Sequence, residues 1–181
     1  AMKSTVNQPA APHPSNLSPS HLNFPVVGIG ASAGGIEAIC TLFRQMPADS
    51  GMAFVIVLHL SPDHQSVADR IIQETTGMPV SQVTAPVPIE RNHVYVISPA
   101  NRLSTNDGYL RVAPANRRRG DHVAIDLFFR DLADVHKDHA FCVVLSGTGA
   151  DGAVGLARVK EQGGVTLVQS LSLIHISEPT R

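Results

Sequence analysis

The sequence contains no tryptophan, only two cysteines, and few aromatic residues, which make up 4 % of the chain. Charged residues make up only 16 %, and the formal net charge of −1 gives no overall field that would attract nucleic acid or an anionic membrane. The longest strongly apolar run, Ala53 to Leu60, is too short to cross a bilayer. No apolar segment follows Lys3 as it would in a signal peptide. We therefore expect a cytoplasmic protein with no nucleic-acid partner and no membrane insertion.

The two cysteines, Cys40 and Cys142, lie in separate apolar segments and lack the CxxC spacing of a redox or zinc site. We expect both thiols to be buried and reduced. The sequence gives no indication of a metal site or of an organic cofactor.

Composition divides the chain into three parts. Hydrophobic residues make up 43 % of the sequence, which is enough for a substantial core. Residues 1–23 are rich in Pro, Ser and Asn without apolar periodicity, which predicts a disordered leader. Residues 24–170 form the predicted domain. Residues 171–181 follow a predicted strand without a turn signal or a helical face, and we interpret them as a vector-derived tail.

Within the domain, short apolar segments alternate with segments that carry apolar residues at helical spacing. The predicted strands are Val26–Gly30, Ala53–His59, Val94–Ser98, Phe141–Gly147 and Gly164–Gln169. The predicted helices are Ile36–Met46, Gln65–Thr75, Ala124–Asp138 and Ala153–Gln162. An Asn-Asp-Gly turn signal predicts a hairpin over Ser104–Val112. This order predicts an α/β fold, with an open, doubly wound, mostly parallel sheet, helices on both faces, and a small β-hairpin.

The first predicted strand leads into Gly30–Gly34 (GASAG), a G-x-S-x-G pattern centred on Ser32 between a strand and a helix. A sharp turn would expose the serine hydroxyl, and the helix N-terminus would offer N–H groups to a developing oxyanion. Gly28, Gly30 and Ala33 also fit a loose dinucleotide fingerprint, which expects an acid about 20 residues further on. A glycine-rich turn with only a packing role is a third interpretation. The motif alone does not decide among them.

His59 ends the second predicted strand. Because parallel strands bring their carboxyl ends to one edge of the sheet, we expect His59 to emerge beside Ser32, where an imidazole can act as a general base. His64 is its rival among the nine histidines. His136 and His139 fall at the polar end of a predicted helix.

Asp151 follows a buried strand in a glycine-rich stretch and comes just before a helix. Glycines around it indicate a backbone that passes close to another part of the molecule. Its carboxylate would lie at the same edge of the sheet and could orient the imidazole. An aspartate at this position would equally suit a helix N-cap.

Five segments in this order resemble the chemotaxis protein-glutamate methylesterase (CheB) family. They are VGIGASAGG at 27–35, His59 with Pro62, YVISP at 95–99, IDLFF at 125–129 and SGTGADGAVG at 146–155. The resemblance implies that Ser32 is the nucleophile, His59 the general base and Asp151 the orienting acid. It also implies hydrolysis of glutamyl methyl esters on chemoreceptors or related signalling proteins with release of methanol, and glutamine deamidation as a second activity.

The chain departs from the family pattern at several positions. Ala33 stands where the family has Thr or Ser, and Thr148 where it has Met, so we expect these residues to offer only backbone N–H groups to the oxyanion. Asp126 is expected to help shape the substrate cleft. The resemblance to the family ends near Ser170, so we expect the family's C-terminal segment to be missing from this sequence. The residues within these motifs most resemble the methylesterase part of fusion proteins that also contain a receptor methyltransferase and sensory domains. A dinucleotide-binding module and a catalytically inactive docking domain are the alternatives.

Overall fold

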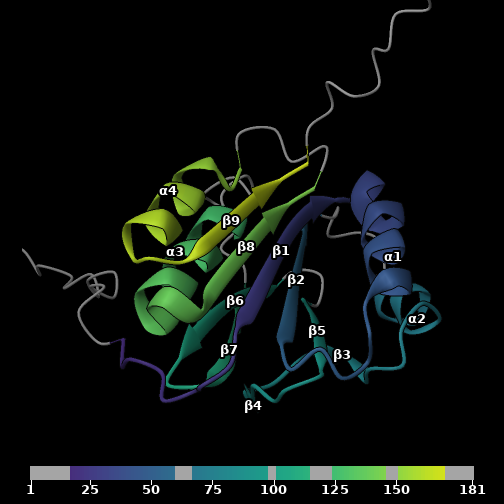
Figure 1. Ribbon diagram of the computed structural model, residues 1–181, viewed down its shortest axis with the longest axis horizontal. Coiled ribbons are helices and arrows are strands. Elements are labelled where there is room, and N and C mark those ends of the chain that lie inside the picture. Colours follow the sequence, from purple (N-terminus) through teal and green to yellow (C-terminus); the bar gives the residue numbers. More distant parts are fainter. Residues whose placement is uncertain (1–16, 60–66, 98–100, 115–123, 146–150, 170–181) are drawn as a thin grey trace, which may run out of the picture.

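The computed structural model describes residues 17–59, 67–97, 101–114, 124–145 and 151–169. In this part of the chain, a six-stranded parallel sheet of order β3-β5-β2-β1-β8-β9 lies beside a three-stranded antiparallel sheet of order β4-β7-β6 (Figure 1). The larger sheet consists of β1 (Val26–Ser32), β2 (Ala53–His59), β3 (Val80–Val83), β5 (Val94–Ile97), β8 (Ala140–Val144) and β9 (Val165–Val168). The smaller sheet consists of β4 (Val87–Pro88), β6 (Asn101–Asn106) and β7 (Tyr109–Pro114).

The helices are α1 (Ile36–Gln45), α2 (Ala68–Gln73), α3 (Ala124–His136) and α4 (Ala153–Glu161), with 3₁₀ turns η2 (Ala33–Gly35) and η4 (Lys137–His139). The predicted α/β class and parallel sheet are confirmed. The structure adds two strands that the sequence did not predict, β3 and β4, because both are short and largely lack a buried apolar pattern. Helix α2 is shorter than predicted, and the hairpin of β6 and β7 is longer.

Helix α3 packs unusually close to the central strand β1, because two positions of that strand have no side chain. A Cβ atom at Gly28 would lie 3.1 Å from side-chain atoms of Phe129 and Leu132. A Cβ atom at Gly30 would lie only 2.5 Å from Ile125 Cγ2. As β1 runs from Gly28 to Gly30, its contacts therefore move toward the start of α3. The N-terminus of α3 thus points toward the carboxyl edge of the sheet.

Helix α1 lies on the opposite face of the sheet, since side chains alternate between faces along a strand. It buries Ile39, Cys40 and Phe43, and the Phe43 ring meets Phe54 of β2 edge to face at a centroid distance of 5.2 Å. Cys40 and Cys142 are both free thiols and buried, as the sequence predicts. The core is therefore continuous through both faces of β1 and β2.

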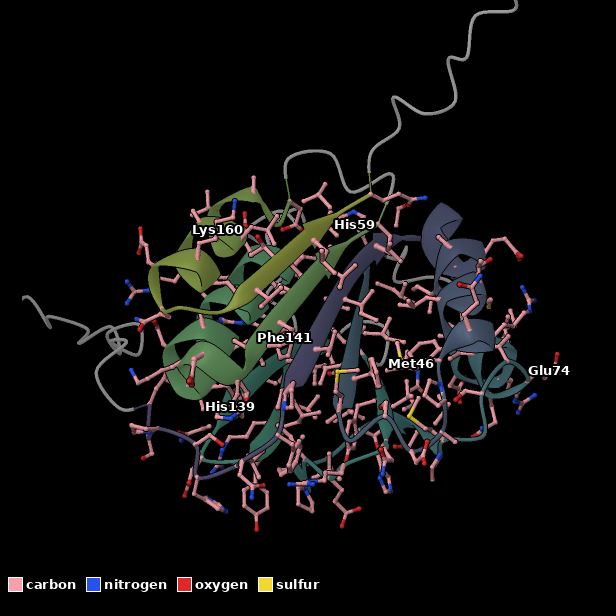
Figure 2. The ribbon with its side chains drawn as sticks, viewed as in Figure 1. Met46, His59, Glu74, His139, Phe141 and Lys160 are labelled. Carbon is pink, nitrogen blue, oxygen red and sulfur yellow. The ribbon has the colours of Figure 1, made fainter. Side chains whose placement is uncertain are left out.

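The outer part of the α1 face is less covered in the ranges described. An apolar cavity of about 230 Å³ extends from Met46, at the end of α1, to Phe141 and Leu167 on β8 and β9. Figure 2 labels Met46 and Phe141 on this face. Leu167 and Val168 of β9 are 59 % and 62 % exposed. The doubly wound arrangement thus ends short of this edge strand.

The packed part of the chain begins before Phe24, the predicted boundary of the domain. Ser18 N–H donates to Asn106 Oδ1 (2.7 Å), and Ser20 N–H donates to the Val135 carbonyl oxygen (2.9 Å). His21 lies 3.0 Å from the Asp107 carboxylate. Residues 17–23 therefore contact the β6–β7 turn and the end of α3, which corrects the inner boundary of the leader, while residues 1–16 and the tail lie outside the described residues. None of the helices in the described ranges is both long and apolar enough to cross a membrane.

Candidate active site

Ser32 and His59 occupy the last positions of neighbouring parallel strands. The register of β1 and β2 pairs Ser32 directly with His59. Paired residues of adjacent strands project to the same face of a sheet, so the hydroxyl and the imidazole share one face. Because side chains alternate between faces along a strand, Ser32 lies on the same face as Gly28 and Gly30, which is the face covered by α3. Both side chains are half-buried. Figure 2 labels His59 at the edge where the arrows of β1 and β8 end.

The serine leads directly into η2 and then α1, so the strand–turn–helix context of the G-x-S-x-G motif is present. Gly34 is close to the Ser32 hydroxyl, since a Cβ atom there would lie 3.7 Å from Ser32 Oγ. The N-cap residue of α1 is Gly35, which has no side chain to accept the N–H groups of the first turn. The positive end of the α1 dipole is therefore directed at the region of the serine.

Asp151 is 7 % exposed and immediately precedes Gly152, the N-cap residue of α4. Its two carboxylate oxygens accept hydrogen bonds from the start of α3, at 2.9 Å from Asp126 N and 3.3 Å from Ile125 N. The N-terminus of α3 points to the same edge as Ser32, so the carboxylate lies on the same side of the sheet as the serine and the histidine. The sequence motif contained no sign that α3 holds this acid. The paired glycines of β1 were the available signal, because they indicate a helix packed against the strand.

Burial is the main cause that raises the pKa of Asp151 above its ordinary value. The N–H groups of Asp126 and Ile125 oppose this effect by stabilising the carboxylate, the Asp126 charge adds to it, and His59 also lowers the pKa of Asp151. The effect of His59 means that the imidazole and the carboxylate lie within electrostatic range of each other. Such a pair can favour a charged imidazole during a reaction.

Asp126, which we expected to help shape the substrate cleft, binds the start of helix α4 through its side chain. Its Oδ1 atom accepts a 2.8 Å hydrogen bond from Gly155 N in the first turn of α4. Of the two expected oxyanion donors, Ala33 begins η2, and Thr148 lies outside the described residues, as does the rival base His64. Among the residues that the structure describes, no group of three or more His, Cys, Asp or Glu side chains is placed to hold a metal ion.

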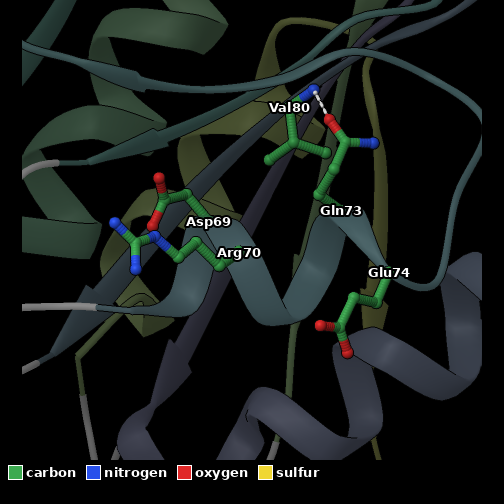
Figure 3. Close-up of a pocket in the computed structure, with 5 residues that line it drawn as sticks. All are labelled: Asp69, Arg70, Gln73, Glu74 and Val80. Atoms are coloured by element: carbon green, nitrogen blue, oxygen red, sulfur yellow. Dashed lines mark hydrogen bonds between the residues drawn. The ribbon is translucent and has the colours of Figure 1, made fainter.

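A separate cavity of about 300 Å³ lies beside α2 and is lined by Asp69, Arg70, Gln73, Glu74 and Val80 (Figure 3). Gln73 Oε1 accepts a 2.8 Å hydrogen bond from Val80 N, which ties the helix to β3. None of the candidate catalytic residues lines this cavity, so it does not belong to the site described above.

The family model described as CheB methylesterase matches residues 27–175 of the chain. The chain belongs to the CheB methylesterase family. The match includes the strand ends that carry Ser32 and His59, the start of α3, and Asp151.

Relatives of the CheB methylesterase family align over most of the chain. A Leptospira interrogans protein, provisionally named protein-glutamate methylesterase/protein-glutamine glutaminase, is 30 % identical over 149 residues, which are 82 % of this chain and 77 % of that protein. Protein-glutamate methylesterase/protein-glutamine glutaminase 2 of Burkholderia lata is 35 % identical over 170 residues, 89 % of this chain but 46 % of that protein. The chain thus spans about half the length of the second relative. The crystal structure of the Thermotoga maritima CheB methylesterase catalytic domain superposes with a TM-score of 0.70 at 21 % identity, covering 80 % of this chain and 79 % of that one.

The dinucleotide interpretation has no support in this CheB-type site. Gly28 and Gly30 lie inside β1 and face α3, where side chains of the helix fill the space beside them. A dinucleotide fingerprint instead places its glycines in the turn after the strand, close to the pyrophosphate. The end of β2 carries His59 where that fingerprint needs an acid.

Proposed function

We propose that this domain hydrolyses glutamyl methyl esters on chemoreceptors or related signalling proteins, releasing methanol and restoring the glutamate side chain. The observation that carries the proposal is the pairing of Ser32 with His59 at the ends of adjacent strands, on the side of the sheet where Asp151 is held. The names of the curated relatives support the same substrate class.

In the first half of the reaction, His59 takes the hydroxyl proton of Ser32 while Oγ attacks the ester carbonyl carbon. The resulting oxyanion is stabilised by backbone N–H groups, for which we propose Ala33 and Thr148. The carbon–methoxy bond then breaks, and the protonated imidazole delivers its proton to the departing oxygen. Methanol leaves, and the substrate is bound to Ser32 as an acyl ester.

In the second half, His59 accepts a proton from water, and the hydroxide attacks the acyl carbon. The bond to Ser32 Oγ breaks, and the serine recovers its proton from the imidazole. The glutamic acid side chain that forms releases its own proton to solvent and remains as a carboxylate. A glutamine side chain would follow the same steps with ammonia as the leaving molecule. Asp151 orients the imidazole and stabilises its charged form in both halves, so the mechanism requires no metal or organic cofactor.

The partner in this proposal is a methylated chemoreceptor. Fusion to, or association with, a receptor methyltransferase and sensory domains would bring the domain to that substrate, and we propose that the reaction takes place in the cytoplasm.

The direct test uses receptor-containing membrane vesicles whose glutamates carry tritiated methyl groups. The wild-type chain should release tritiated methanol, and Ser32→Ala and His59→Ala should each reduce turnover by roughly 10⁵- to 10⁶-fold. A fluorophosphonate probe should label Ser32 in the wild type and label the His59→Ala protein only weakly. Methanol release that persists in Ser32→Ala would refute the mechanism, and labelling that depends on His64 would move the base to that residue.

A further inference from the structure

We infer that Asp126 is a positioning residue for the catalytic acid, because it joins α3 and α4 at the point where Asp151 is held. The inference rests on the proposed function of Asp151. Asp126 is not assigned contact with substrate here. It acts through the backbone of α4 and through the N–H groups that bind the Asp151 carboxylate.

The two aspartates exchange hydrogen bonds between the helices. The Asp151 carboxylate, next to α4, accepts N–H groups of Ile125 and Asp126 in the first turn of α3. The Asp126 carboxylate, in α3, accepts the Gly155 N–H group in the first turn of α4. Each helix is therefore capped by an acid that belongs to the other helix or to its flank. A shift of either N-terminus would strain the contacts of both carboxylates.

The cap from Asp126 takes the place of a local one. The N-cap residue of α4 is Gly152, which has no side chain and whose φ of 101° lies in the left-handed region. The N–H groups of this first turn must find acceptors elsewhere, because the first four N–H groups of a helix have no partner within the helix. Asp126 supplies one of those acceptors. The same residue thereby fixes the helix start that follows Asp151.

Two glycines, Gly152 and Gly155, allow α3 and α4 to pack so closely that neither helix can shift without a steric clash. A Cβ atom at Gly155 would lie 2.6 Å from Phe129 Cβ and 3.0 Å from the Asp126 carbonyl oxygen. A Cβ atom at Gly152 would lie 3.2 Å from Ile125 Cγ2. With this spacing, the hydrogen bond from Gly155 to Asp126 sets how far Asp151 reaches toward His59. Since a misplacement of about 1 Å can cost about 10²-fold in rate, this contact should affect turnover.

The test compares Asp126→Ala and Asp126→Asn with a matched variant of the same two helices, Asp134→Ala. Asp134 also joins α3 to α4, through hydrogen bonds from Arg158 Nε (2.7 Å) and Gln162 Nε2 (3.3 Å), but it lies two turns further along α3. Each variant of the full chain is assayed for methanol release from tritiated receptor vesicles, and its Tm is measured separately.

We expect Asp126→Ala to lower kcat roughly 10- to 100-fold with little change in KM. Asp126→Asn retains an acceptor for Gly155 N–H, so it should restore kcat to within about threefold of the wild type. Asp134→Ala should lower Tm to a similar extent and leave kcat unchanged. If Asp126→Ala does not fold, Asp126→Glu replaces it, because the longer side chain keeps the charge but displaces the acceptor, and it should show the same loss of kcat.

Three results would overturn the inference. The first is a wild-type kcat in Asp126→Ala or Asp126→Glu, the second an equal loss of kcat in Asp134→Ala, and the third a failure of Asp126→Asn to recover turnover. These results differ from a failure of the proposed function, in which the wild type itself would release no methanol and would not react with the fluorophosphonate.

Discussion

At its N-terminus, α3 donates two N–H groups to the buried carboxylate of Asp151, and at its C-terminus it buries the imidazole of His136 against Thr105. The two titratable side chains are equally hidden, at 7 % and 4 % exposure. Both Asp151 oxygens have donors, whereas His136 bonds through Nε2 alone (3.0 Å to Thr105 Oγ1), and its Nδ1 atom has no partner among the described residues. The degree of burial therefore does not distinguish the two ends.

What distinguishes them is the supply of partners for a charge. The N-terminus of a helix offers N–H groups and a positive dipole end, so a carboxylate can be buried there at tolerable cost. A helix C-terminus would favour a charged histidine, but burial, aided by the nearby His139, lowers the pKa of His136 to about 4. One end of α3 can thus hold a charge for a reaction, and the other holds a neutral ring that packs against the smaller sheet.

The largest expected effect separates the two ends by activity. Asp151→Asn should lower kcat roughly 10⁴-fold, because the amide no longer orients and stabilises the imidazole as the carboxylate does. His136→Gln should leave kcat close to that of the wild type, since this end of the helix lies away from Ser32. Steady-state methanol release measures both. Equal losses in the two variants would mean that α3 responds as a single rigid unit and that its ends do not differ in function.

The second effect is a pH dependence of stability that arises at the His136 end. The pKa of His136 falls from an ordinary 6.5 to about 4 on folding, so the unfolded chain binds the proton more readily. The contribution of the neutral ring is complete above pH 6.5 and is lost as the pH falls toward 4. The free energy of unfolding should decrease by roughly 3 kcal/mol over this window from this group alone.

Asp131, on the same helix, opposes that trend. Burial raises its pKa from 3.8 to about 6, so its stabilising contribution is complete below pH 3.8 and is lost as the pH rises through 6. To isolate the contribution of His136, the free energy of unfolding in urea is measured for the wild type and for His136→Gln at pH 7, 6 and 5, and the two values are subtracted at each pH. The difference in free energy of unfolding between the wild type and His136→Gln should shrink as the pH falls. In Asp131→Asn the opposing contribution is removed, so the free energy of unfolding should fall more steeply with decreasing pH than in the wild type. A difference independent of pH would show that His136 does not change its protonation on folding.

The third effect tests the contact that directs α3 toward the site. In Gly30→Ala, the new methyl group would meet Ile125 Cγ2 at 2.5 Å, so the start of α3 must move. Overpacking of this kind costs about 1–3 kcal/mol, and the displaced Ile125 N–H group should also lower kcat. Gly28→Ala is the matched control, because its methyl group meets the middle of α3 at 3.1 Å. It should reduce stability and affect kcat much less. A larger kcat loss in Gly28→Ala would contradict the role assigned to the helix start.

The edge of the sheet that carries the candidate site could be predicted because Ser32 and His59 lie at strand ends. Apolar strand patterns located the ends of β1 and β2, and parallel pairing predicted that Ser32 and His59 emerge at one edge. The structure adds the register, which pairs the two residues directly. The support of Asp151 could not be predicted in this way. Its partners, Ile125 and Asp126, precede it by 26 and 25 residues, and only tertiary packing brings these segments together.

The His136 end was predicted incorrectly for a related reason. Helical periodicity placed His136 at the polar end of α3, but β6 covers that turn and leaves the ring 4 % exposed. The hairpin signal covered only Ser104–Val112, whereas β6 and β7 extend over Asn101–Asn106 and Tyr109–Pro114. Thr105 was already inside the predicted hairpin, so the missing information was not the length of the hairpin but the packing of β6 against the end of α3, which only tertiary structure reveals.

The smallest net change is expected when both members of the His136–Thr105 pair are replaced. Thr105→Val alone removes the partner of Nε2 and leaves a buried imidazole with neither nitrogen bonded among the described residues, which should cost about 1–3 kcal/mol. Adding His136→Leu removes the polar ring as well, and replacing both partners by apolar groups is often close to neutral. The double variant should therefore recover to within about 1 kcal/mol of the wild type, with kcat unchanged. Urea unfolding at pH 7 of both single variants and the double variant gives the coupling energy. If the two losses simply add, the hydrogen bond contributes little, and the neutral ring is held at this end of α3 by packing alone.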